Sequence, residues 1–226
     1  MSNVTHLWAI YLATLIGLLP IINPLSAGPS FLAMTEGDSA QWRHTQAIRG
    51  CLYMVVILVS FLVGGTYIMN FFGISIPGLR IAGGILLTGI AMNMLAAQKG
   101  SDKTEAEMQA AAKKKGDISF SPLAMPMLSG PGSIAVTIGL TSVAQDWVDY
   151  FAIIAGIITV AITTYLVLRL SSQMVRLFGP IGINAMTKIM GFLLMAMGVQ
   201  FVVNGVLGIA TDPVMLRGIK AVLSGD

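Results

Sequence analysis

The chain has 226 residues, of which 55% are hydrophobic and only 10% are charged, and its mean hydropathy is +0.82. Soluble domains carry about 25% charged residues, so this composition excludes an ordinary soluble fold. The net charge of +3 is small and its excess lies in polar segments, so it gives no reason to expect a nucleic-acid partner.

Apolar runs close to 20 residues long recur along the whole chain, and this is the length that an α-helix needs to cross a bilayer. We therefore predict an all-α membrane protein with six transmembrane spans. In chain order, the predicted spans are residues 6–23 with a half helix at 30–34, then 51–72, 74–97, 119–143, 151–170, and a segment within 181–210.

Polar segments separate these runs and divide the chain. We expect loops at 35–49 and around Asp146 and Asp149, a basic connection with Arg169 and Arg176, and every acidic residue outside the spans. The predicted division is a first three-span repeat at 1–97, a cytoplasmic polar linker at 98–117, a second three-span repeat at 118–210, and an extracytoplasmic tail at 211–226.

Spans one and four are each interrupted by helix breakers, at 23–30 and 126–132. Proline has no N–H and its ring clashes with the preceding turn, so neither segment is predicted to continue as an α-helix. Breakers at matching places in two apolar segments are a pointer to a transporter binding site. The matching pairs, 102 residues apart, are Pro24 and Pro126, Gly28 and Gly130, and Pro29 and Pro131.

The two halves also match at their third spans. The sequence from Arg80 to Gly83 corresponds to that from Lys188 to Gly191, and both continue as apolar sequence. Because each half has an odd number of spans, the second half would enter the membrane from the opposite side. The pattern predicts two inverted three-span repeats, with chance similarity between apolar segments as the alternative.

Basic residues sort unequally between the two sides that six spans define. Ten of the 13 lie on the side of 35–49, 98–117 and the connection near Arg176. The positive-inside rule therefore places these segments in the cytoplasm and both termini outside.

The interrupted spans are the predicted substrate site. A half helix that begins after a break presents free N–H groups and a partial positive charge, which suit a carboxylate. The alternative is a structural kink satisfied by neighbouring helices. The candidate substrate-binding residues are Asn23, Pro24, Ser26, Gly28, Pro29, Pro126, Ser129, Gly130, Pro131, Gly132 and Ser133.

Two cations lie within apolar sequence, Arg80 and Lys188. Three roles are open to these side chains: extending to the membrane interface, bonding to carbonyl groups at a helix C-terminus, or lining a path for an anion. Asn93 and Gln200, with Asn184 and Asn204 nearby, either bond between helices or line the same path. The candidate lining residues are Arg80, Asn93, Lys188 and Gln200.

The sequence lacks the residues that several kinds of chemistry require. The predicted spans hold no Asp or Glu for a proton relay, and the chain has no P-loop. A single cysteine, Cys51, and two unclustered histidines offer no metal or thiol site. We expect no cofactor, no metal and no enzyme activity.

Several stretches are similar to the MarC family of bacterial integral membrane proteins, within the LysE-like transporter superfamily. They are Asn23-Pro24, FGISIPGLRIAGG ending at Gly84, PLAMPMLSGPGSIA at 122–135, and KIMGFLLMAMGVQFVVNG at 188–205. The resemblance implies six spans, an inner-membrane location and a role in transport. One member described as a small-neutral-amino-acid transporter implies alanine, glycine, serine or threonine as substrate.

The expected function is secondary transport by alternating access around the two interrupted spans. Its partners would be the lipid bilayer and a small molecule, an amino acid by the resemblance. A non-transporting membrane scaffold or accessory subunit is one alternative, and an ion or water channel is another.

Overall fold

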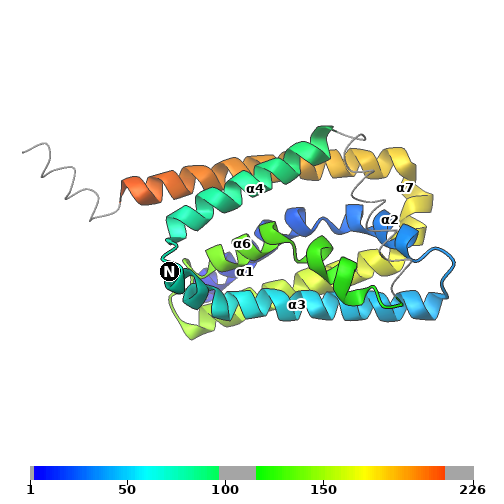
Figure 1. Cartoon of the computed structure of the whole chain (residues 1–226), viewed down its shortest axis with the longest axis horizontal. Coiled ribbons are helices and arrows are strands. Elements are labelled where there is room, and N and C mark those ends of the chain that lie inside the picture. The colour runs from blue at the N-terminus through cyan, green and yellow to red at the C-terminus, as the bar shows by residue number, and fades with distance from the viewer. Residues whose placement is uncertain (1–2, 97–115, 212–226) are drawn as a thin grey trace, which may run out of the picture.

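The computed structural model describes residues 3–96 and 116–211, and these form helices and their connections without a strand (Figure 1). The helices are α1 (Asn3–Ile22), α2 (Pro24–Met34), α3 (Ala40–Phe71), α4 (Ile76–Ala96), the π-helical segment η1 (Ser119–Leu128), α6 (Pro131–Leu140) and α7 (Trp147–Ala210). The predicted polar linker at 98–115 and the predicted tail at 212–226 lie outside the described residues.

The described helices have the length and composition of membrane spans. Five are long and apolar enough to cross a bilayer, and a sixth span results if η1 and α6 are taken together. The two arms of α7, Trp147–Gly179 and Ile181–Ala210, count separately, because the backbone at Gly179 has φ 62° and Pro180 follows it. Large apolar side chains such as Phe71, at 84% exposed, face outward, as in a protein surrounded by lipid. The prediction of an all-α membrane protein is thus confirmed.

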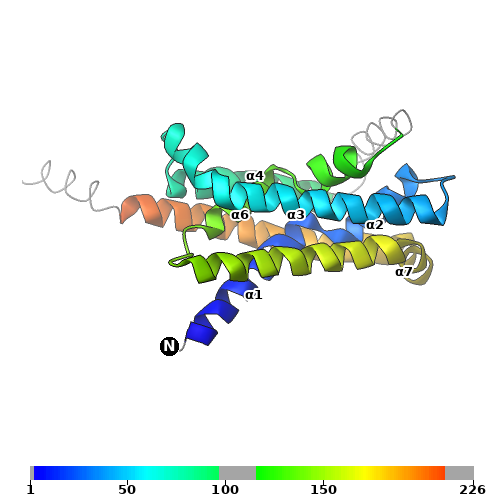
Figure 2. The same cartoon turned by 90° about the horizontal axis from the view of Figure 1, so that it is seen from below.

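The helices form an elongated bundle with its connections at two ends (Figures 1 and 2). The loop 35–39 and the turn of α7 lie at one end, here called the Gly179 end. The N-terminus, the connections 72–75 and 141–146, and the end of α7 lie at the other, here called the Asp146 end. Each half of the chain has the same order of elements. The first half has the pair α1–α2, then the long helix α3, then α4, and the second half has the pair η1–α6, then the first and second arms of α7.

The first interruption is much shorter than the sequence predicted. Only Asn23 leaves the helical conformation, with φ 42° and ψ 67°, and α2 begins at Pro24. The prediction of an unwound 23–30 segment is wrong. Pro24 is tolerated because an N–H in the first turn of a helix has no acceptor within that helix. The missing N–H of proline therefore breaks no helical hydrogen bond. Gly28 and Pro29 lie inside α2, where Pro29 forgoes one backbone hydrogen bond.

The second interruption overlaps its predicted place at 126–132, because the chain bends at Ser129 and Gly130, but the irregular backbone begins earlier. The backbone is already non-helical at Ser121 and Met125, within η1, whereas Pro131 and Gly132 are the first two residues of α6. The two segments meet at an angle of 64° across Ser129 and Gly130. As in α2, a proline occupies the first helical position, where its missing N–H costs nothing.

Two predicted loops are helical. The segment 35–49 was expected as a loop, yet α3 begins at Ala40, because the Ser39 hydroxyl caps it by accepting the Trp42 N–H at 3.2 Å. The polar first turns of α3 also make tertiary contacts, since the buried Gln46 side chain accepts the Ile118 N–H at 3.1 Å.

The connection expected around Arg169 and Arg176 belongs to α7, which continues to Gly179. Asp149, expected in a loop, lies in the first turn of α7 and is 3% exposed. Its Oδ2 accepts the Gln145 N–H at 2.8 Å, and its Oδ1 lies 3.3 Å from His6 Nδ1. A carboxylate suits this position because it offsets the positive end of a helix.

The second arm of α7 packs closely along α4 through small residues. Gly191, Gly198 and Gly205 recur every seven residues and all face α4. A Cβ on Gly198 would lie 2.9 Å from the Gly84 carbonyl oxygen, and one on Gly205 would lie 2.8 Å from that of Pro77. A seven-residue recurrence keeps one face toward a partner helix over its length. Small residues let two backbones approach where lipid supplies no hydrophobic driving force.

Candidate functional site

A cavity of about 500 Å³ lies between α1, α4, α6 and the second arm of α7. Most of its wall is apolar, and its polar groups come from α4 and α7. Its lining residues are Ala13, Ile16, Gly17, Arg80, Val136, Gly139, Leu140, Val143, Met197, Gln200, Phe201 and Asn204.

Arg80 is the charged residue of this cavity. It is half-buried, and its Nη2 donates a hydrogen bond to Ser142 Oγ, which in turn donates to the Gly139 carbonyl oxygen at 2.7 Å. Among the described residues, the ion pairs within 4.0 Å join His6 to Asp149 and Arg49 to Asp117, and neither involves Arg80. A guanidinium has five N–H donors, so Arg80 retains donors for an anion.

The amide side chains of Gln200 and Asn204 lie one turn apart on α7, and Gln200 Nε2 donates to Asn204 Oδ1 at 2.8 Å. The amide oxygen of Gln200 can still accept a hydrogen bond, and the Asn204 amide nitrogen can still donate one. A cavity with one cation, a pair of amides and apolar walls can hold a small carboxylate whose body is apolar.

The first interruption and α2 lie beside both arms of α7. Asn23 is 6% exposed and its Oδ1 accepts the Ser26 N–H at 3.4 Å. The Ser26 and Thr187 hydroxyls are hydrogen-bonded at 3.1 Å. Pro24 is buried, while Gly28 and Pro29 face α7, where a Cβ on Gly28 would lie 3.3 Å from Ser171 Cβ.

The second interruption contains an unsatisfied hydroxyl. Ser129 is fully buried, and its Oγ has no hydrogen-bond partner among the residues that the structure describes. The nearby Ser133 hydroxyl donates to the Gly130 carbonyl oxygen at 2.9 Å, and is also buried. A buried hydroxyl without a partner is uncommon and costs free energy, so Ser129 is the residue of this segment that most needs a partner.

The two interruptions approach each other in the bundle. A Cβ on Gly132 would lie 3.4 Å from Ile21 of α1 and 3.0 Å from Leu87 of α4. Gly17 and Val136 line the cavity. Gly17 is six residues from Asn23, and Val136 is six residues from Gly130, which is roughly 9 Å along a helix in each case. A Cβ on Gly17 would lie 3.2 Å from Val136 Cγ1. The cavity therefore extends from near the interruptions toward the Asp146 end.

The structure brings together part of the predicted lining. Arg80 and Gln200 line the cavity, whereas Asn93 and Lys188 are exposed and do not. The eleven predicted residues of the interrupted spans lie outside its lining, and two of these, Pro126 and Pro131, are exposed. Asn204 was singled out in the sequence, but Ser142 was not, because its contact with Arg80 joins residues 62 apart in the chain.

Within 3–96 and 116–211, no group of three or more His, Cys, Asp or Glu side chains could hold a metal ion. Cys51 is buried in α3 among apolar residues.

Known proteins similar to this chain cover most of its length. A model of the MarC family of integral membrane proteins matches residues 8–210. Inner membrane protein MarC of Salmonella typhimurium is 40% identical over 205 residues, covering 86% of this chain and 93% of that protein. Its counterpart in Escherichia coli strain UTI89 is 39% identical over the same coverage. No solved structure matches.

Proposed function

The chain belongs to the MarC family of integral membrane proteins, and from that premise we propose that it is a secondary transporter of small neutral amino acids. The observation that carries the proposal is the cavity with Arg80, Gln200 and Asn204, which extends from near the two interruptions to the Asp146 end. A scaffold that only packs helices has no need of a half-buried arginine that, among the described residues, has no carboxylate partner.

The polar groups of the cavity match the two charges of an amino acid. The guanidinium of Arg80 would hold the carboxylate, and the amide oxygen of Gln200 would accept from the ammonium group. The apolar walls would surround a small side chain. The substrate would then pass to the second interruption, where the first N–H groups of α6 and the Ser129 hydroxyl would receive the carboxylate.

Alternating access would come from an inverted repeat. The order of elements is the same in each half of the chain, and α1–α2 and η1–α6 run in opposite directions through the bundle (Figure 1), which supports this part of the proposal. In the present conformation the cavity lies toward the Asp146 end, while α2 packs on α7 through Ser26 and Gly28. Rocking of one half against the other would expose the site at the Gly179 end.

The experiment is amino-acid flux into proteoliposomes, with and without ion gradients, for the parent and two matched variants. Arg80→Gln should lower kcat/KM for a transported amino acid by about tenfold or more, because a hydrogen bond to a charged group contributes about 1.5–3 kcal/mol. Arg80→Lys should retain part of the flux. Lys188→Gln, which removes an exposed cation outside the cavity, should stay within about twofold of the parent.

Three results would count against the proposal. Equal flux in the parent and Arg80→Gln would remove the cavity from the substrate path. No flux and no saturable binding across the amino-acid panel would favour a scaffold or accessory subunit. Fast, unsaturable flux would favour a channel.

A further inference from the structure

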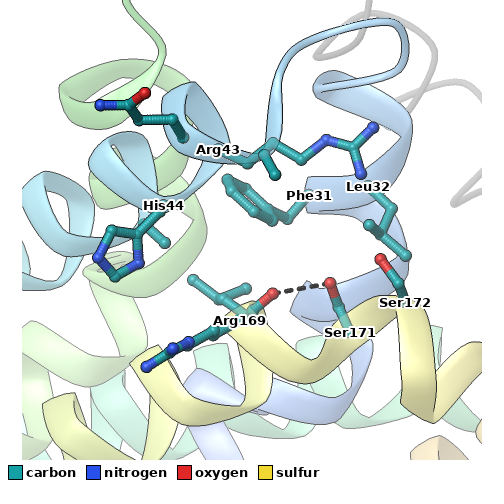
Figure 3. Close-up of a pocket in the computed structure, with 11 residues that line it drawn as sticks. Phe31, Leu32, Arg43, His44, Arg169, Ser171 and Ser172 are labelled. Carbon is teal, nitrogen blue, oxygen red and sulfur yellow. Dashed lines mark hydrogen bonds between the residues drawn. The ribbon is translucent and has the colours of Figure 1, made fainter.

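A second cavity, of about 450 Å³, lies at the Gly179 end between the end of α2, the start of α3 and the first arm of α7 (Figure 3). It shares no lining residue with the cavity of Arg80. The residues that matter for its chemistry are Phe31, Arg43, His44, Arg169, Ser171 and Ser172.

The rim of this cavity is basic on two sides. Arg43 extends over the end of α2, and His44 and Arg169 lie together across the cavity from it (Figure 3). Arg43 Nε donates to the Thr35 carbonyl oxygen at 3.1 Å, which leaves its terminal N–H groups available. His44 Nδ1 lies 3.1 Å from the Tyr165 hydroxyl.

Neither arginine is neutralised in the part of the chain that the structure describes, since the ion pairs found there involve His6 and Arg49. Arg169 contacts an uncharged partner, donating weakly to the Tyr165 hydroxyl at 3.5 Å. Two uncompensated guanidinium groups on opposite sides of one cavity favour an anion between them.

The floor of the cavity is apolar. Phe31 is 2% exposed and Leu168 is 1% exposed, while Ser172 is exposed at the rim. The cavity also lies where α3 changes character, because its polar first turns precede the apolar sequence that begins near Cys51. A basic rim over an apolar floor, at the level where a span leaves the hydrocarbon, matches an amphiphile with an anionic headgroup.

We propose that this cavity binds the phosphate of an anionic phospholipid, with Arg43 and Arg169 on the phosphate oxygens and the acyl chains alongside α3. Arginine pairs with phosphate through parallel N–H···O bonds, and basic pockets between membrane helices hold anionic headgroups in this way. The proposal does not depend on transport, and its test does not measure flux.

Trp42 provides a reporter beside the cavity, since it precedes Arg43 in α3. The other two tryptophans are exposed and can be replaced as Trp8→Phe and Trp147→Phe. The full-length protein with Trp42 alone is reconstituted in phosphatidylcholine that contains a titrated fraction of brominated phosphatidylglycerol or brominated phosphatidylcholine. Quenching of Trp42 then gives the relative association constant of the two lipids.

We expect phosphatidylglycerol to be preferred by roughly 25-fold, since each of the two basic residues near the membrane surface contributes about fivefold in affinity for an anionic lipid. Arg169→Gln should reduce the preference several-fold, and Arg43→Gln with Arg169→Gln should abolish it. The matched control is Arg176→Gln, an exposed cation of α7 outside this cavity, which should keep the preference.

Equal quenching by the two lipids in the Trp42 protein would overturn the proposal. An equal loss in Arg176→Gln would also overturn it, because surface charge in general would then explain the preference. A third arm measures thermal unfolding in detergent with inorganic phosphate. Stabilisation by phosphate without a preference for phosphatidylglycerol would assign the cavity to a soluble anion and refute the lipid site.

Discussion

Asn23 is the single non-glycine residue with a positive φ in the described part of the chain, and α1 ends where α2 begins around it. Asparagine reaches the left-handed region more easily than other residues, and its side chain also caps α2 through the Ser26 N–H. Its two contributions, backbone conformation and capping, are both structural. A loss of flux on changing Asn23 therefore does not by itself show contact with a substrate.

Asn23→Ala should lower the free energy of unfolding by about 2 kcal/mol, because alanine loses the cap and strains the left-handed backbone. Asn23→Gly should cost only a few tenths, since glycine keeps the conformation and substitutes well at a cap. Denaturation in detergent micelles measures both. Equal losses for the two variants would contradict this account. If Asn23→Gly keeps normal stability but loses flux, the Asn23 side chain contacts the substrate.

Ser129 offers a test in which packing is measured by thermal stability and binding by the KM for flux. Its buried hydroxyl has no partner within the described part of the chain, so Ser129→Ala should raise thermal stability slightly by removing an unsatisfied group. If the hydroxyl receives the substrate, the same change should raise the KM for amino-acid flux about fivefold or more. Higher stability with an unchanged KM would leave Ser129 outside the substrate path. Thr137→Ala is a useful comparison, because that buried hydroxyl already donates to the Ser133 carbonyl oxygen at 2.8 Å.

The contact between α4 and the second arm of α7 depends on glycines at the crossing. A Cβ on Gly84 would lie 2.5 Å from the Gly198 carbonyl oxygen, which is backbone and cannot move alone. By contrast, a Cβ on Gly89, five residues further along α4, would meet no described atom within 4 Å. The two glycines share a helix and differ in what surrounds them.

Gly84→Ala should therefore destabilise the protein by about 1–3 kcal/mol, the usual cost of overpacking. Gly89→Ala should be neutral or stabilising by about 0.5 kcal/mol, since alanine favours the helix. Thermal unfolding in one detergent, followed by circular dichroism, compares them directly. Equal stability of Gly84→Ala and the parent would show that α4 and α7 do not cross at these residues.

At the scale of the whole molecule, successive connections lie at opposite ends of the bundle. The topology can therefore be tested at residues that the structure describes. Asp38 lies in the loop at the Gly179 end, and Gln145 lies in the connection at the Asp146 end, and both are exposed. The positive-inside rule predicts that the Gly179 end is cytoplasmic and the termini are outside. Cys51, the one native cysteine, is 5% exposed and is a weak competitor for labelling.

A membrane-impermeant maleimide on intact cells should label Gln145→Cys, and should label Asp38→Cys only after permeabilisation. Ser2→Cys and Lys113→Cys, outside the described residues, should follow the same division. Labelling of Asp38→Cys and Gln145→Cys from the same side would refute an odd number of spans between them. It would also remove the inverted repeat and alternating access from the proposed function.

The sequence by itself determined the class of the protein and its approximate spans. Long apolar runs need helices in a bilayer because every backbone polar group must find a partner there, so the pattern from 51 to 72 could only be helical. It also marked Arg80, Gln200 and Asn204, since polar side chains in apolar sequence carry an energetic cost. The exact ends were less predictable, as Ser39 shows by starting α3 eleven residues before the apolar run.

The tertiary structure decided how these residues are combined. A proline can break a helix or begin one, and only the surrounding backbone determines which, so Pro24 and Pro131 became first residues of α2 and α6. Ser142 meets Arg80 only because α6 folds back beside α4. The cavity exists because distant segments leave space between them. Sequence patterns constrain the local backbone and burial, whereas a cavity depends on the packing of helices that are remote in the chain.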